Sequence, residues 1–232
     1  MAKNFNDPRV VENYDQHIRC LIPGYELMHL QIQAILSCHL KSNAKILIAG
    51  CGTGYELQYL ARQFPQATFV AIDPSLNMID AAKERLTKEQ DLGRVDFIHG
   101  DSSVLLQYSR DQFENNFDAA LAILVSHFIA ELEKTQYFKN LNRCLKQGGL
   151  IISYDLMQMD RETQQILFSL AQLNGLTEQQ SQNMIARLEH DFTLIEPEEM
   201  NKLLAECGFE NVRKYMQISG YHGFYGFKAS VI

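Results

Sequence analysis

Residues 45–55, Lys-Ile-Leu-Ile-Ala-Gly-Cys-Gly-Thr-Gly-Tyr, decide the fold of this chain. A short apolar run leads directly into Gly50, Gly52 and Gly54 and then into a helical pattern, which predicts a buried strand that turns sharply into a helix. Glycine suits this turn because a Cβ atom would obstruct both the backbone conformation and the close approach of a ligand. The free amides of the helix N-terminus would face that ligand. The stretch therefore predicts a strand, a binding loop and a helix.

The alternation of apolar runs and helical patterns continues beyond this loop. We expect strands at residues 46–49, 68–72, 95–98, 117–124 and 150–154, and helices at residues 55–64, 76–86 and 131–145. Strands that alternate with helices form βαβ units, which build a mainly parallel sheet between two helical layers. The sequence therefore predicts an α/β fold with a Rossmann-like, doubly wound sheet.

The N-terminal segment has a different pattern. Residues 9–40 predict two helices with a break at Pro23-Gly24. Apolar residues recur at spacings of three and four, as at Leu27, Leu30 and Ala34. We expect these two helices to cover an edge of the core.

The C-terminal part also departs from the alternation. Residues 159–195 predict a polar helical insertion, and residues 197–206 predict a helix that Gly208 stops. Two further strands, at residues 212–218 and 224–231, are expected to form a hairpin joined by residues 219–223. The sheet then has seven strands, and the last strand is antiparallel.

The length and composition fit one globular domain. The chain has 232 residues, of which 46% are hydrophobic and 21% are charged, as in an ordinary folded protein. We divide this single domain into four parts: an N-terminal helical cap (9–40), a cofactor-binding core (45–155), a helical insertion (159–195) and a C-terminal helix with a β-hairpin (196–232).

Charge and hydropathy argue against a nucleic-acid-binding protein and against a membrane protein. A net charge of −7 disfavours nucleic acid and anionic lipid as general partners. The first residues lack an apolar signal region, and the longest apolar stretch, residues 119–125, is too short to span a bilayer. We therefore expect a cytoplasmic protein without a membrane partner. Five scattered cysteines without a Cys-x-x-Cys pair indicate reduced thiols and no metal site.

Asp73 strengthens the interpretation of the glycine loop as a binding site. It ends the next predicted strand, at the spacing of about 20 residues at which a carboxylate accepts the hydroxyls of a ribose. A nicotinamide-binding loop would be Gly-x-Gly-x-x-Gly, whereas this loop is Gly-x-Gly-x-Gly and has Tyr55 at the last glycine position. A Walker A loop is excluded because no Gly-Lys-Ser/Thr follows.

In these features residues 45–155 resemble the core of class I S-adenosylmethionine-dependent methyltransferases, and the terminal hairpin is similar to the family's reversed seventh strand. The resemblance implies S-adenosylmethionine as cofactor. It places Gly50–Gly54 beneath the methionine part, Asp73 and the adjacent Pro74 at the ribose, Asp101-Ser102 beside the adenine, and Leu124 at the remaining wall. The implied cofactor-binding residues of the core are thus Gly50, Cys51, Gly52, Thr53, Gly54, Asp73, Pro74, Asp101, Ser102 and Leu124.

One departure from the family pattern concerns the strand before the loop. The family usually has Asp or Glu at the end of this strand, where the present chain has Ala49 and no acidic residue. A contact to the ammonium group of the cofactor would then come from elsewhere. The absence of this acid is also the one feature that favours a non-enzymatic function, as a non-catalytic cofactor-binding partner subunit.

A narrower resemblance lies outside the core. Residues 22–26, Ile-Pro-Gly-Tyr-Glu, and the C-terminal hairpin resemble carboxy-S-adenosylmethionine synthases, which implies that Tyr25 is a lid residue over the cofactor, exposed when the cofactor is absent. The synthases pair an arginine of the inserted helical region with the extra carboxylate of their product. In this chain the register places Ile185 there, with Arg187 two residues away. The loop Cys51-Gly52-Thr53 is closer to ordinary methyltransferases.

His127 is the candidate catalytic residue. It follows the fourth strand of the core, at the carboxyl end of the sheet, where open α/β folds bind ligands. Methyl transfer depends chiefly on positioning, and a general base is needed only when the acceptor must lose a proton. A histidine at this place can equally make a structural hydrogen bond near a helix start. Tyr154 and Asp155 end the fifth strand on the same rim, where they can line the acceptor site or cap a helix.

The sequence thus predicts S-adenosylmethionine-dependent methyl transfer to a small-molecule acceptor, with a homodimer as the candidate assembly. The alternative is a carboxy-S-adenosylmethionine synthase-like transferase linked to tRNA modification. Incubation with S-adenosylmethionine and prephenate, followed by mass analysis of the nucleoside, distinguishes the two. The acceptor is not fixed by the sequence, because fold and cofactor do not determine the substrate.

Overall fold

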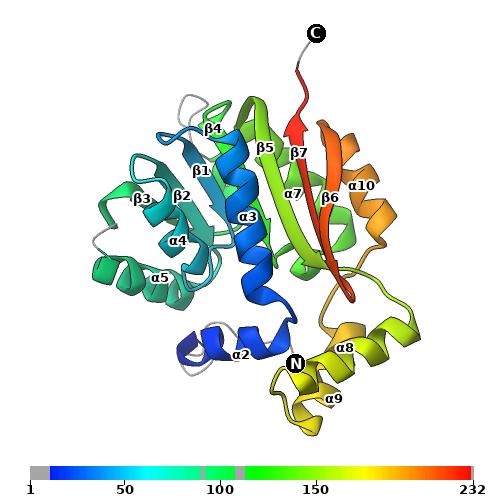
Figure 1. Ribbon diagram of the computed structural model, residues 1–232. Coiled ribbons are helices and arrows are strands. Elements are labelled where there is room, and N and C mark those ends of the chain that lie inside the picture. Colours follow the sequence, from blue (N-terminus) through cyan, green and yellow to red (C-terminus); the bar gives the residue numbers. More distant parts are fainter. Residues whose placement is uncertain (1–10, 90–91, 108–112, 231–232) are drawn as a thin grey trace.

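A seven-stranded sheet runs through the centre of the molecule (Figure 1). The computed structural model describes residues 11–89, 92–107 and 113–230. The strands are β1 (Lys45–Ala49), β2 (Thr68–Asp73), β3 (Val95–His99), β4 (Phe117–Ile123), β5 (Leu145–Leu156), β6 (Phe209–Ile218) and β7 (Tyr221–Lys228).

The strand order is β3-β2-β1-β4-β5-β7-β6. Strands β1 to β5 pair in parallel, and β7 is antiparallel to both of its neighbours, β5 and β6. The predicted α/β class, the seven strands and the antiparallel last strand are therefore confirmed. The chain reverses its direction of winding between β1 and β4, and such a switch point opens a ligand crevice at the carboxyl ends of the strands.

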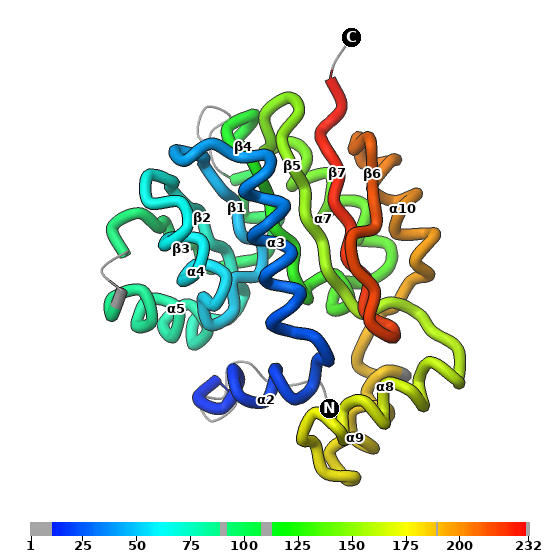
Figure 2. Tube along the Cα trace, in the orientation of Figure 1, coloured from blue at the N-terminus to red at the C-terminus, as the bar shows by residue number. Residues whose placement is uncertain are grey.

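Helices cover both faces of this sheet. The helices are α2 (Tyr14–Leu21), α3 (Tyr25–His39), α4 (Tyr55–Gln63), α5 (Leu76–Glu89), α7 (Glu131–Cys144), α8 (Arg161–Leu173), α9 (Glu178–His190) and α10 (Pro197–Glu206), with short 3-10 turns η1 (Leu92–Arg94), η2 (Ser102–Leu106) and η3 (Ser126–Phe128). Helices α3, α4 and α5 pack on one face, and α7 and α10 pack on the other. Figure 2 shows α2, α8 and α9 gathered at one end of the sheet.

The second N-terminal helix, α3, lies on a face of the sheet, whereas both N-terminal helices were expected to cover an edge of the core. Among the buried residues of α3, the apolar residues Met28, Ile32 and Leu36 are fully buried in the same cluster as the strand residue Ile48. Their spacing of four residues places them in one stripe of the helix. Leu27, which the sequence pattern placed in the core, is half exposed.

The C-terminal hairpin is tighter than predicted. Ser219 and Gly220 alone form the turn, because Ile218 already pairs with Tyr221 in the ladder. Ser219 has a positive φ of 50°, as two-residue hairpin turns require. Tyr221 is therefore a strand residue, and its side chain is buried.

The helical insertion consists of α8 and α9. Each begins with a side-chain cap, because Asp160 accepts from the Thr163 N–H at 2.7 Å and Thr177 forms a capping box with Gln180. Apolar residues of both helices join the core cluster beneath α3. Asn174, between the two helices, donates to the Cys20 carbonyl at 3.0 Å and so connects the insertion to α2.

Candidate functional site

The glycine loop joins β1 to α4 in a backbone conformation that favours glycine. Gly50, Gly52 and Gly54 have φ values of 90°, 50° and 78°. A Cβ atom on Gly50 would lie 2.3 Å from Cγ2 of Val125, and one on Gly54 would lie 2.8 Å from Cβ of Ala82. At Gly52 the same position meets open space. Two of the glycines thus allow close packing, and the middle one faces an open cradle.

Asp73 fastens this loop to the end of β2. Its Oδ2 accepts from the Gly52 N–H at 2.9 Å, and its Oδ1 accepts from the Ser75 N–H at 2.9 Å. Burial raises the pKa of Asp73, although both N–H groups act in the opposite direction. Each carboxylate oxygen keeps a further lone pair for a ligand hydroxyl. The structure thus places Asp73 beside the loop, as the sequence predicts, and adds an anchoring role that the sequence did not indicate.

The residues after β3 lie at the same end of the sheet. The Asp101 side chain is exposed and caps η2 by accepting from the Ser103 N–H at 2.7 Å. Ser102 is buried against α7, where Asn140 lies 3.4 Å from its hydroxyl oxygen. Of the two residues proposed for the adenine, Asp101 is the accessible one. The carbonyl of Pro74 is occupied by His99 at 3.0 Å.

Leu124 forms the sharp end of β4. Its φ is 59°, a left-handed conformation that is unusual for a branched side chain, and its N–H donates to the Tyr154 carbonyl at 2.7 Å. Such conformations cluster at functional sites, where the surrounding structure holds them. The turn directs the chain into η3, which carries His127.

A buried carboxylate orients His127. Nδ1 of His127 hydrogen-bonds Oδ1 of Asp155, which is fully buried at the end of β5. The other carboxylate oxygen accepts from the Ser126 N–H at 2.6 Å. Burial opposes ionisation of Asp155, but the contacts with His127 and Ser126 outweigh it and hold the pKa of Asp155 below its ordinary value. Lys134 donates to the carbonyl of Ile129 at 2.8 Å and fixes the turn.

His127 lines a mainly apolar pocket at the carboxyl end of β4. The pocket is lined by Tyr14, Ile18, Leu21, Ile22, Leu124, His127, Phe128, Leu156, Met184, Arg187, Leu188, Phe192 and Tyr221. These residues come from α2, the ends of β4 and β5, α9 and the start of β7. An apolar pocket with a few convergent polar groups is the usual form of a small-molecule site.

Arg187, and not Ile185, is the residue of the insertion that reaches this pocket. Ile185 faces a separate depression with Phe168 of α8. The Arg187 guanidinium lies 5.2 Å from the ring centre of Phe192 and pairs with Asp191 at 2.7 Å. The residue of α9 that lines this pocket is thus two residues beyond the position to which the sequence register assigned the arginine.

Two tyrosines differ from their predicted roles. Tyr25 is buried (6% exposed), and its ring contacts His29 at 4.4 Å and Tyr55 at 5.7 Å between centres. The expectation of an exposed lid side chain was wrong, because α3 packs Tyr25 into the aromatic cluster above α4. Tyr154 is also fully buried, stacked on Tyr221 at 6.0 Å, and does not line the pocket.

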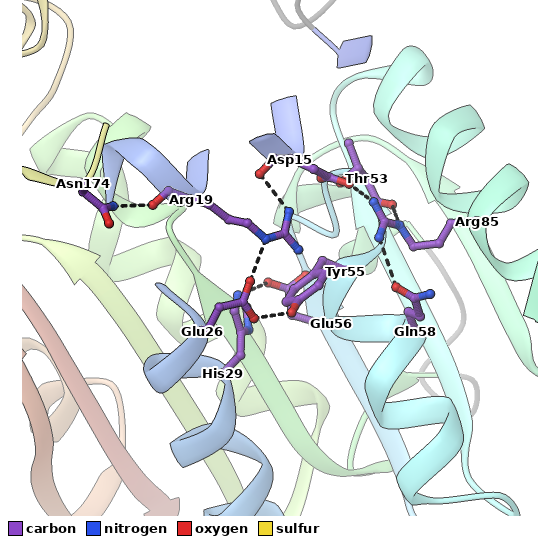
Figure 3. A network of polar contacts seen from close by, with 10 residues as sticks. All are labelled: Asp15, Arg19, Glu26, His29, Thr53, Tyr55, Glu56, Gln58, Arg85 and Asn174. Atoms are coloured by element: carbon purple, nitrogen blue, oxygen red, sulfur yellow. Dashed lines mark hydrogen bonds and ion pairs between the residues drawn. The ribbon is translucent and has the colours of Figure 1, made fainter. Parts of the chain in front are cut away.

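A polar network that the sequence did not reveal ties α2 to the glycine loop (Figure 3). Asp15 accepts from the Thr53 hydroxyl at 2.6 Å and pairs with Arg85 of α5. Arg85 also donates to the Thr53 carbonyl at 2.8 Å. The partners are far apart in the chain, so no local motif could have indicated them. The network makes α2 a cap over the loop.

The comparisons with known proteins agree with this geometry. Residues 46–149, from β1 into β5, match the family described as "Methyltransferase domain". By this match residues 46–149, a little under half of the chain, form a methyltransferase domain. S-adenosylmethionine is accordingly the cofactor of this methyltransferase.

The relatives fall into two groups. Malonyl-[acyl-carrier protein] O-methyltransferase of Priestia megaterium is 30% identical over 126 residues, which are 54% of this chain but only 42% of that protein. Carboxy-S-adenosyl-L-methionine synthase of Desulfotalea psychrophila is 24% identical over 236 residues, which cover 98% of this chain and 93% of the synthase. The likeness to the synthase thus includes the cap and the insertion.

A solved structure shares the fold of this methyltransferase. Phosphoethanolamine N-methyltransferase 2 of Haemonchus contortus, in complex with S-adenosyl-L-methionine, superposes with a TM-score of 0.68 at 16% identity. The match covers 99% of this chain and 61% of that protein.

The residues around the loop fit this cofactor. Gly52 leaves room for close backbone approach, and the Asp73 carboxylate has the acceptor capacity that two ribose hydroxyls need.

Within the described ranges, no helix is long and apolar enough to cross a membrane. The same residues contain no group of three or more metal-ligating side chains.

Proposed function

We propose that this methyltransferase transfers the methyl group of S-adenosylmethionine to a small-molecule acceptor bound in the pocket beside His127. The observation that carries the proposal is the pairing of His127 with the buried Asp155 at the wall of an apolar pocket, two residues after Val125, which packs against Gly50 of the loop. The bound cofactor supplies an electrophilic methyl group on a sulfonium. The chain itself would position the two reactants, exclude water and remove a proton from the acceptor.

The cofactor-binding residues that we propose follow the loop and the strand ends. The methionine part would be held by the loop residues Gly50, Cys51, Gly52, Thr53 and Gly54. The ribose would contact Asp73 and Pro74, and the adenine would contact Asp101 and Ser102. Leu124 would separate the cofactor from the acceptor. Tyr25 would act from beneath α2, as a buried support of the methionine end and not as a lid. We propose that the whole chain forms one domain.

His127 is the proposed general base. Asp155 holds Nδ1 of the ring, so Nε2 is the nitrogen that can take a proton from an acceptor hydroxyl or amine. Asp155 itself is a positioning residue, because it has no access to the pocket. A carboxylate that orients an imidazole in this way also stabilises the imidazolium that forms.

A screen for turnover tests the proposed function. Labelled S-adenosylmethionine is incubated with sets of small apolar alcohols, amines and carboxylic acids, and the label in the extracted acceptor is counted. His127→Asn should lose label transfer while it binds S-adenosylhomocysteine normally. Binding of S-adenosylhomocysteine without transfer to any acceptor would instead favour the non-catalytic partner subunit.

A second candidate function is favoured by two observations. The synthase relatives cover nearly the whole chain, and Arg187 provides a cation in the pocket. We therefore keep a carboxy-S-adenosylmethionine synthase-like activity as the alternative. Incubation with S-adenosylmethionine and prephenate should leave the nucleoside mass unchanged if the chain is a methyltransferase. A mass gain of one carboxylate would establish the alternative.

A further inference from the structure

Glu56 is a buried acid next to the glycine loop. It is the second residue of α4, directly after Gly54 and Tyr55, and only 9% of it is exposed. Figure 3 shows its side chain between α4 and α3, beside His29. His29 is 1% exposed, and its Nε2 lies 3.8 Å from Oε1 of Glu56. The packing of the apolar core does not require a carboxylate at this position.

The neighbouring cations do not neutralise Glu56. Arg85 acts electrostatically on Glu56, but its three nitrogens are engaged by the Thr53 carbonyl, Gln58 and Asp15. His29 is neutral, because burial lowers its pKa to about 3. Its Nδ1 contacts the Tyr59 hydroxyl at 3.0 Å, and its Nε2 has no hydrogen-bond partner among the described residues. The cluster thus contains a buried acceptor without a matching cation.

The surroundings of Glu56 are electronegative as well as buried. Burial raises the pKa of Glu56 to about 7; its own N–H and Arg85 oppose this rise, and Asp15 and Asp73 add to it. The other groups that face it are the hydroxyls of Tyr14 on α2, of Tyr25 on α3 and of Tyr59 on α4. A ligand cation that binds in this cluster would therefore be stabilised, because it would compensate the negative charge of the buried Glu56 carboxylate.

The cofactor brings such a cation. S-adenosylmethionine carries an α-ammonium and a sulfonium against one carboxylate, so its net charge is positive. The strand before the loop ends in Ala49 and supplies no acid. Glu56 stands on the other side of the same loop, within electrostatic reach of Asp73 and of Cys51 in the loop.

We propose that Glu56 binds the α-ammonium of the cofactor and replaces the acid that the preceding strand lacks, with His29 and Tyr59 positioning its carboxylate. The inference rests on the placement of the cofactor in the proposed function. It makes Glu56 a determinant of recognition for the amino-acid end, separate from the ribose and adenine contacts.

The proposal predicts a pH dependence with a defined sign. A bound ammonium favours the ionised form of Glu56, so binding releases a proton wherever the free protein holds one. Affinity for S-adenosylhomocysteine should therefore rise as the pH increases toward about 7 and level off above it. The pKa of Asp73 is also raised by burial, but Asp73 would act on any ligand that carries the ribose.

Calorimetry with two ligands separates these sources. S-adenosylhomocysteine has the amino-acid end, whereas 5′-methylthioadenosine has the same ribose, adenine and thioether without it. Glu56→Gln should weaken S-adenosylhomocysteine by on the order of tenfold to a hundredfold, as expected for one charge-assisted hydrogen bond. Binding of 5′-methylthioadenosine should stay within about twofold. Glu84→Gln, an exposed acid on α5, is the matched loss of charge and should change neither ligand.

The same titrations overturn the proposal if the outcome differs. Equal weakening of both ligands would make Glu56 a structural residue, and no weakening of either would place the ammonium elsewhere. The wild-type protein alone gives a second check: the pH dependence must be steeper with S-adenosylhomocysteine than with 5′-methylthioadenosine, which keeps only the contribution of Asp73, and equal dependence with both ligands would contradict the proposal. If Glu56→Gln does not fold, Glu56→Asp keeps the charge at shorter reach and should keep the pH dependence with reduced affinity; loss of that dependence contradicts the proposal. Normal binding without methyl transfer would refute only the proposed function.

Discussion

The two halves of the site are built in opposite ways. The proposed cofactor half, residues 50–54 with Asp73 and Asp101, comes from the ends of strands that follow one another in the chain, and it is held by hydrogen bonds from backbone N–H groups to the two carboxylates. The acceptor half, the pocket around His127 and Arg187, is assembled from α2, α9 and the ends of β4, β5 and β7. Local chain geometry fixes the first half, and long-range packing fixes the second. Changes in one half should therefore leave the function of the other intact.

The largest effect is expected from Asp155→Asn in the acceptor half. The amide cannot hold Nδ1 of His127 in the same tautomer, so we expect methyl transfer to fall by about 100-fold to 10,000-fold. The measurement is the rate with the acceptor found in the label-transfer screen, over a range of pH. An unchanged rate and pH profile would mean that the acceptor needs no base and that His127 has a structural role.

Gly50→Ala tests the contact that joins the two halves. The new Cβ would lie 2.3 Å from Val125 at a positive φ, so we expect a loss of about 1–3 kcal/mol in the free energy of unfolding. Gly52→Ala is the control, because Gly52 also has a positive φ, of 50°, but its new Cβ would meet open space. Urea denaturation compares the two variants. Equal destabilisation would show that Val125 moves aside without cost.

Asp73→Ala should affect the cofactor half only. It removes the acceptor of the Gly52 N–H and of the proposed ribose hydroxyls, so S-adenosylhomocysteine should bind more weakly by about 1–3 kcal/mol. Asp80→Ala, at an exposed position of α5, serves as control in the same calorimetric titration. Normal affinity of the Asp73 variant would reduce Asp73 to an anchor of the loop.

The contrast between the halves also explains how far the sequence could be interpreted. The alternation of strands and helices, the glycine turn and the place of Asp73 at a strand end follow from local patterns, because the residues that create each feature are neighbours in the chain. His127 was found because it follows a strand at the carboxyl edge, but its partner Asp155 belongs to the next strand, so only the sheet topology joins them.

The features that the sequence missed are long-range or depend on helix rotation. The contact of Asp15 with Thr53 joins a cap helix to the loop, and no pattern within either segment requires it. That Arg187 lines the pocket and Ile185 does not could not be predicted, because the pattern of a short amphipathic helix does not fix its rotation against its neighbours. Tyr25 was expected to be exposed because the packing of α3 onto a face of the sheet was not foreseen.

The smallest effect is expected from Asp15→Asn, which loosens the tie between α2 and the loop. Asp15 and Arg85 are both partly exposed, so solvent screening limits the loss of stability to less than about 1 kcal/mol. Hydrogen exchange should nevertheless become faster in α2 than in α7, because α2 has few other contacts with the core. Uniform exchange throughout the variant would show that α2 is held by its apolar residues alone.

The most direct test of the separation between the halves is calorimetric titration of Asp155→Asn with S-adenosylhomocysteine. The variant disables the acceptor half at a fully buried position without touching the glycine loop or Asp73. The account predicts a dissociation constant within about twofold of the wild-type value. A loss of affinity as large as that caused by Asp73→Ala would contradict it and show that the two halves form one inseparable unit.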